Sequence, residues 1–365
     1  MALLALAPSL QAATPATTAS RELVDLGVRP ASVSVAADGD SFAAVYDDRL
    51  TANALRFAER VDGLWSTTIV ASILDGKRVG REPMLAISHT GIRLIAFRSD
   101  VSFDPTRVPS GSLYAARSNR GGPWAIDPID ANGFGESVAF DRQGHPAIAY
   151  LARTGLGNQA ELRLARLIGG HWQIEHLEMT TYLQAPGGSN ASAVGLAFDH
   201  AGTPFIAFVD PASHSVRLIT PGKPSVRIGD APPAAARAVV SFGANGSAAV
   251  VAAGLVGDNE PLRMLYRLSD GRWRGDQIGE SGSSAPTIVG FSGRRPVIAY
   301  RDPDAVAVAR PSFAGTYAFE TVLKQAAPPS SRVSGSLGAA RLLGDVGVAL
   351  VSPKGLLEFS SSPLT

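Results

Sequence analysis

Aspartates recur at one kind of position, just after an apolar run that ends in an aromatic residue. Asp48, Asp210 and Asp302 follow such runs by two residues, and Asp100 follows another by three. Carboxylates that recur at equivalent turns could ring a shared opening and bind a cation or sugar hydroxyls. They could equally accept backbone N–H groups within their own turns, the commoner role for aspartate there. Both interpretations stay open on the sequence alone.

Three long segments, residues 98–111, 151–159 and 179–192, are predicted to be loops on the same side of the fold as these aspartates. Long loops on a rigid scaffold are where recognition tends to reside. The candidate ligand contacts within them are Asp100, Phe103, Arg107 and Tyr182. The alternative is that these segments are ordinary insertions.

Several kinds of chemistry are excluded or left without support. The chain has no cysteine, so disulfides, thiolate nucleophiles, zinc–thiolate sites and iron–sulfur clusters are excluded. Its six histidines are scattered without metal-ligand spacing, and no nucleophile elbow, P-loop or dinucleotide fingerprint occurs. We therefore expect no catalytic motif and no cofactor, with a structural cation such as calcium as the one exception left open.

A repeated unit must position the candidate residues. It reads as a short apolar strand, a glycine turn and a second apolar strand that ends in an aromatic, as in residues 137–150, 195–208 and 288–300. From Gly39 to Gly344 the turn glycines advance 305 residues in six steps, or about 51 residues per step. Four short strands per unit at roughly this period are typical of a β-propeller blade.

The second half of the unit carries all four tryptophans. Trp65, Trp124, Trp172 and Trp273 occupy one turn position, between the third and fourth strands. Their rings are expected to cover the outer part of the blade core, with the indole N–H on a polar partner. The alternative is a set of aromatic platforms for sugar rings.

The sequence predicts an all-β, seven-bladed propeller with four-stranded antiparallel blades. The last unit lacks a fourth strand, and an orphan strand-like segment, residues 22–27, precedes the first unit. This segment is expected to complete blade seven and close the ring, which removes exposed sheet edges. The expected blades are about 31–82, 83–136, 137–192, 193–236, 237–285, 286–333, and 334–365 together with 21–30.

The repeat Phe-Asp-x-x-Gly-x-Pro-x-Ile-Ala-Tyr, followed by Gly-x-Trp, resembles the repeats of exported bacterial propellers of the broad sialidase-like and lectin-like kind. The resemblance covers about residues 22–365 and implies the fold more than a function. Sialidases carry Asp boxes at the turn that holds Asp62 to Trp65 and Asp270 to Trp273, but the spacing here departs from that box. No motif identifies the arginine triad or the Tyr–Glu pair of a sialidase.

Composition and the N-terminus indicate where the protein acts. A net charge of +1 gives no reason to expect nucleic acid as a partner, and no stretch is apolar for long enough to span a membrane. Residues 1–13 resemble the later part of a secretory signal peptide, so residues 1–20 are interpreted as a signal remnant and linker. We expect a secreted, periplasmic or cell-surface protein, and the alternative is an Ala-rich leader without that role.

Three functions compete. The first is a non-catalytic recognition module that binds glycan or protein through its loop-rich face. The second is a sialidase-like glycoside hydrolase or lyase, whose paired carboxylates would lie about 5–10 Å apart in one deep pocket around the central channel. The third is a structural or assembly propeller, which predicts a broad apolar surface patch.

Overall fold

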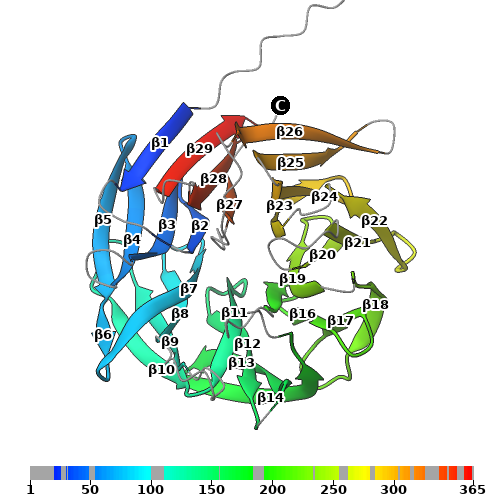
Figure 1. Ribbon diagram of the computed structural model, residues 1–365, viewed down its shortest axis with the longest axis horizontal. Coiled ribbons are helices and arrows are strands. Elements are labelled where there is room, and N and C mark those ends of the chain that lie inside the picture. Colours follow the sequence, from blue (N-terminus) through cyan, green and yellow to red (C-terminus); the bar gives the residue numbers. More distant parts are fainter. Residues whose placement is uncertain are drawn as a thin grey trace, which may run out of the picture.

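The computed structural model is a closed ring of seven antiparallel sheets, with no helix in the residues that it describes (Figure 1). Those residues are 20–25, 30, 32–48, 54–99, 111–155, 157–183, 193–232, 235–254, 262–279, 284–302, 305–312, 316–324, 337–342, 345–351 and 357–363. The predicted seven-bladed propeller is confirmed.

Blades are numbered here by the chain order of their innermost strands, β2, β7, β11, β15, β19, β23 and β27. Blade 1 consists of β2 (Val33–Asp38), β3 (Ser41–Asp48), β4 (Ala54–Val61) and β5 (Leu64–Ala71). Blade 2 consists of β6 (Ile73–Leu74), β7 (Lys77–Ile87), β8 (Arg93–Ser99), β9 (Leu113–Ser118) and β10 (Ala125–Asp130). Blade 3 consists of β11 (Gly133–Phe140), β12 (Pro146–Arg153), β13 (Gln159–Ile168) and β14 (His171–Thr181).

The remaining blades follow the same order. Blade 4 consists of β15 (Gly195–Phe198), β16 (Pro204–Asp210), β17 (Ser215–Ile219) and β18 (Val226–Asp230). Blade 5 consists of β19 (Ala235–Phe242), β20 (Ala248–Gly254), β21 (Leu262–Arg267) and β22 (Trp273–Ile278). Blade 6 consists of β23 (Ser284–Ser292), β24 (Arg295–Asp302), β25 (Ala305–Pro311) and β26 (Tyr317–Lys324). Blade 7 consists of β27 (Leu337–Leu342), β28 (Asp345–Val351), β29 (Leu357–Pro363) and the N-terminal β1 (Ser20–Asp25).

The N-terminal strand closes the ring, as the sequence predicted. β1 pairs antiparallel with β29 and becomes the outermost strand of blade 7. Strands from the N-terminal and the C-terminal part of the sequence therefore share one sheet (Figure 1). The seven innermost strands then contact one another in a closed cycle, β2–β7–β11–β15–β19–β23–β27 and back to β2. Closure gives every blade two neighbours and leaves no blade face open.

Packing between blades holds the ring together. Each interface between neighbouring blades contains its own cluster of buried apolar residues, from blades 1 and 2 around to blades 7 and 1. The second strand of a blade is covered on both faces, and β8 is buried along its whole length. Strands buried on both faces are expected to be apolar without alternation, which explains the continuous runs in the sequence.

The Phe-Asp-x-x-Gly repeat forms the turn of the first hairpin. Asp141 Oδ1 accepts hydrogen bonds from the backbone N–H groups of Gln143 and His145, each at 2.8 Å. Gly144 has a φ of 84°, a left-handed conformation that glycine adopts at little cost. The aspartate and the glycine of the repeat are therefore conformational requirements of this turn.

Each of the four tryptophans contacts the blade that precedes its own. Trp65 Nε1 donates to Glu22 at 3.1 Å, and Trp172 Nε1 donates to Asp127 at 3.0 Å, each across a blade interface. Trp124 packs edge-on against Phe57 of the preceding blade at 5.4 Å between ring centroids. Trp273 packs against the cluster between blades 4 and 5. All four rings are half-buried, so the packing role predicted for them explains their shared position.

Some boundaries differ from those expected. β7 begins at Lys77 and β11 at Gly133, whereas blades 2 and 3 were expected to start at residues 83 and 137. Both strands contain an irregularity in their pairing near the expected boundary, which interrupts the apolar pattern. The described residues contain no helix long and apolar enough to cross a membrane.

Candidate functional site in the central channel

The three recurring aspartates in the described residues lie at strand ends, as predicted, but they serve different local structures. Asp48 is buried and accepts a hydrogen bond from Arg56 Nε at 2.8 Å. Asp210 accepts from the Ala212 backbone N–H at 3.1 Å and from Ser213 Oγ at 2.6 Å. Asp302 is half-buried at the end of β24. The contacts of Asp210 match the turn-capping alternative, whereas Asp48 forms an ion pair with Arg56 on the next strand.

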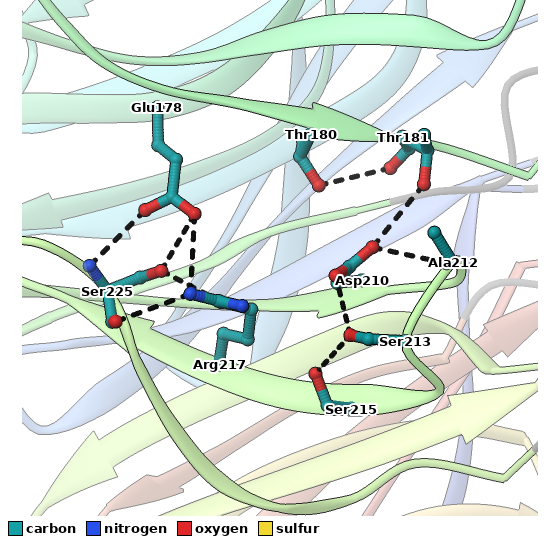
Figure 2. Close-up of polar contacts among 9 residues, drawn as sticks. All are labelled: Glu178, Thr180, Thr181, Asp210, Ala212, Ser213, Ser215, Arg217 and Ser225. Carbon is teal, nitrogen blue, oxygen red and sulfur yellow. Dashed lines mark hydrogen bonds and ion pairs between the residues drawn. The ribbon is translucent and has the colours of Figure 1, made fainter.

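Figure 2 shows that Asp210 belongs to a polar network between blades 3 and 4. Thr181 Oγ1 of blade 3 donates to Asp210 at 3.4 Å. In the same interface, the Ser225 hydroxyl donates to Glu178 at 2.8 Å. Arg217 Nε donates to the oxygen of that Ser225 hydroxyl, also at 2.8 Å. This network is mutually satisfied, and its contacts hold two blades together.

The other predicted contacts do not form a solvent-facing site in the described residues. Tyr182 is fully buried, packs edge-on against Phe134 at 4.9 Å, and donates its hydroxyl to the Gly157 carbonyl at 3.0 Å. Asp100, Phe103 and Arg107 lie outside the described residues.

A cavity of about 240 Å³ occupies the centre of the ring, where the innermost strands of all seven blades contribute to its wall. Small and apolar residues such as Val35, Leu196 and Ala339 make up much of that wall. Ser34 and Ser137 also line it, and their hydroxyls accept the backbone N–H groups of Leu85 and Leu196 across blade interfaces, both at 3.1 Å. The hydroxyls of Ser34 and Ser137 are thus engaged within the wall, which also contains a few charged side chains.

Irregular pairing places those charged side chains at the cavity. The register of β7 shifts between Arg81 and Met84, and that of β11 shifts between Phe134 and Ser137. The residues that interrupt these ladders include Glu82, which has a left-handed φ of 50°, and Glu136. β-Bulges re-aim side chains that a regular strand would direct into a blade interface.

A third shift occurs in β19, between Ala235 and Arg237. All three shifts lie where the first strand of a blade begins, beside the end of its second strand. We call this side of the ring the loop face. The cavity is therefore charged where it approaches the loop face.

Arg98 connects the two glutamates. Its guanidinium, only 4% exposed, donates a hydrogen bond to Glu82, and its Nε lies 3.9 Å from Oε2 of Glu136. Burial opposes the positive charge on Arg98, but the carboxylates of Glu82 and Glu136 together outweigh that effect and raise its pKa. Arg98 therefore keeps its charge inside the wall.

Burial dominates the titration of Glu136. Its side chain is 1% exposed, and neither carboxyl oxygen has a hydrogen-bond partner among the described residues. Burial raises the pKa of Glu136 to about 8, the nearby Arg98 only partly opposes this effect, and the Glu82 carboxylate adds to it. Glu82 is 39% exposed on its side chain and pairs with Arg98. The site thus combines a carboxyl group of raised pKa with a paired carboxylate.

Arg237 faces the same cavity from blade 5. Burial lowers its pKa, and the Glu82 carboxylate acts in the opposite direction from a distance. Guanidinium groups stay protonated in proteins even so. In the part of the chain that the structure describes, no acid lies within ion-pair distance of Arg237. The cavity therefore contains a cation without a partner of its own.

Sequence reasoning missed Glu82, Glu136, Arg98 and Arg237. One signal was present, because Glu82, Glu136 and Arg237 each stand just before the apolar part of a first strand. Recognising that signal requires knowing that the strand bulges there. The described residues contain no group of three acidic or histidine side chains that could hold a metal ion.

The chain matches no protein-family model and no curated protein in sequence. Its fold is similar to that of catalytically inactive virginiamycin B lyase from Staphylococcus aureus, crystallised with quinupristin, at 14% identity, a TM-score of 0.56, and coverage of 94% of this chain and 99% of that one. It is also similar to the α-L-arabinanase of Penicillium chrysogenum, at 14% identity, a TM-score of 0.51, and coverage of 77% and 92%. At such low identity, these similarities establish the β-propeller fold and leave the function to be argued from the site.

Proposed function

We propose that this protein is a recognition propeller that binds the end of a glycan in its central cavity, approached from the loop face. The observation that carries the proposal is the cation of Arg237, which lines the cavity and has no ion-pair partner among the described residues. A charged group held in a cavity without a partner is costly, and a fold keeps one chiefly where it does something other than stabilise the fold.

The size of the cavity favours a glycan end over a folded protein. Cavities for drug-sized ligands measure roughly 300–1,000 Å³, whereas this one measures about 240 Å³ and suits a group of about one sugar ring. The wall alternates apolar surface with a few polar groups, which is the usual composition of a small-molecule site. The recognition site proposed here is therefore the channel rather than the rim aspartates.

A structural or assembly role has less support. It predicts one broad apolar patch, but the exposed large apolar side chains of the described residues are spread over six blades, from Leu23 on β1 to Phe319 on β26. Action outside the cytoplasm is also part of the proposal, and it rests on the signal-like composition of residues 1–13.

A glycan array probed with the full chain tests the proposal. We expect binding by the wild type and its loss in Thr287→Phe, which fills the cavity from β23. Thr203→Phe places the same side chain in a first-hairpin turn, at the opposite end of the strands, and should leave binding unchanged. Equal binding by both variants, or no glycan bound at all, would refute a cavity-bound glycan.

One observation favours a second candidate, a glycoside hydrolase or lyase. Glu136 and Glu82 both belong to the wall of one cavity, and burial raises the pKa of Glu136, as it does for the acid of many enzymes that cleave glycosidic bonds. Incubating each glycan bound on the array with wild type and with Glu136→Gln separates the two functions. A binder returns every glycan intact, whereas a hydrolase or lyase cleaves one, and Glu136→Gln then binds it without cleavage.

A further inference from the structure

Arg237 sets the charge that a ligand in the cavity must carry. Arg237 is partly buried, lines the cavity, and has no ion-pair partner among the described residues. The Glu82 carboxylate acts on its charge but is already paired with Arg98. A guanidinium in this situation is short of one anionic partner, and a planar carboxylate is the group that its fork of donors matches best.

Glu136 contributes to the wall of the cavity, but both of its carboxyl oxygens are covered, and Arg98 Nε lies 3.9 Å from one of them. A ligand in the cavity therefore meets the guanidinium of Arg237 rather than this carboxyl group.

The Glu82 carboxylate limits the charge that a ligand can carry. Glu82 and Arg237 both line the cavity, and the Glu82 carboxylate acts on Arg237. A phosphate dianion would approach the Glu82 carboxylate, where like charges repel strongly at low local dielectric.

We propose that the cavity binds a saccharide through a carboxylate, as found on a uronic acid or a comparable sugar acid, with Arg237 holding the carboxylate. This inference rests on the proposed function and names its ligand class. It makes Arg237 the residue that selects acidic over neutral saccharides, because a fixed, unpaired cation discriminates between ligands that differ only in charge.

Titration calorimetry on the full chain tests the inference with short oligosaccharides in matched pairs, one ending in a hexuronic acid and the other in the corresponding hexose. Hexose 6-sulfate and hexose 6-phosphate derivatives form two further arms. We expect the uronic acid member to bind the wild type at least about tenfold more tightly than its neutral partner, as expected for one charge-assisted, bidentate contact. Both sulfate and phosphate members should bind more weakly than the uronic acid.

Arg237→Gln should remove that preference, lowering affinity for the acidic member by about tenfold or more while changing affinity for the neutral member little. Because the wild-type guanidinium makes no ion pair among the described residues, the variant should fold about as well as the wild type, which thermal unfolding checks. Arg272→Gln is the matched control, because the Arg272 side chain is 79% exposed. This variant should leave both affinities unchanged.

The outcomes separate this inference from the proposed function. Equal affinities for acidic and neutral members, or an acidic preference that survives Arg237→Gln, overturns the carboxylate assignment and leaves glycan binding intact. Tighter binding of the sulfate or phosphate member also overturns it. Failure of every saccharide to bind overturns the assignment and the proposed function together.

Discussion

Asp25 at an outer blade interface and Glu136 at the central cavity differ in whether their carboxyl oxygens accept hydrogen bonds. Asp25, on the closing strand, accepts the hydroxyl of Tyr46 at 2.7 Å and lies 4.0 Å from Arg56 Nη1. Glu136, on the innermost strand of blade 3, has no hydrogen bond to either oxygen among the described residues. Where the fold alone needs a polar group, it supplies partners for that group.

The same arrangement of residues occurs at the interface between blades 2 and 3. Asp130, at the end of blade 2, accepts the hydroxyl of Tyr150 at 3.1 Å and pairs with Arg163 Nη1 at 2.6 Å. The same residue types thus join blades 2 and 3, which follow one another in the chain, and blades 7 and 1, where the ring closes. The comparison teaches that satisfied acids at this position belong to blade assembly, whereas Glu136 at the axis lacks hydrogen bonds to its oxygens among the described residues and does not serve assembly in this way.

The largest expected effect comes from breaking the closure. Val24 on β1 is buried against blade 1, whereas its neighbour Leu23 is 46% exposed. Val24→Asp buries a charge without a partner and should lower the free energy of unfolding by about 3 kcal/mol. Leu23→Asp makes the same change on the exposed face and should cost less than about 0.5 kcal/mol. Urea unfolding of both variants measures the difference, and equal losses would mean that β1 does not seal the ring through its buried face.

An intermediate effect comes from the titration of Glu136. Its native pKa of about 8 lies above its ordinary value of 4.5, so the native state holds an extra proton between those two values. This contribution to stability is fully present below pH 4.5 and is lost as pH rises through about 8. From pH 6 to pH 9 we expect a loss of about 2 kcal/mol in the free energy of unfolding, which Glu136→Gln should largely abolish. A wild type and a variant with parallel pH profiles would show that Glu136 titrates normally.

The smallest expected effect compares the two outer interfaces directly. Tyr46→Phe and Tyr150→Phe each remove one hydroxyl from an aspartate that keeps its arginine. Each should cost about 1 kcal/mol in the free energy of unfolding, since one buried hydrogen bond is lost in each case. Denaturant unfolding of the two variants side by side checks the equivalence. A much larger loss for Tyr46→Phe would mean that the closing interface differs in kind from the internal one.

Local patterns were enough to predict most of the architecture. The Asp-x-x-Gly turn, the doubly buried second strand and the tryptophan turn recur because every blade meets the same neighbours, so one repeated unit appears seven times. The missing fourth strand of the last unit and the orphan segment before the first were enough to predict closure. The five-stranded form of blade 2, with β6 as an added strand, was not predicted from the pattern.

The candidate site could not be predicted in the same way. Asp48 and Asp210 recur with the unit, but recurrence reflects the needs of the blade, and both proved to be engaged in local contacts. Glu82, Glu136 and Arg237 interrupt the unit, and nothing in the order of the chain shows that three blades direct them to one cavity.

The sequence by itself determined the strand pattern, the number of blades and the strand that closes the ring, because those depend on periodic apolar burial and on turns a few residues long. Only the tertiary structure decided which charges meet, because bulges in separate blades turn side chains far apart in the chain toward one axis. Burial at that axis then decided their protonation, since desolvation depends on everything packed around a group and not on its neighbours in sequence.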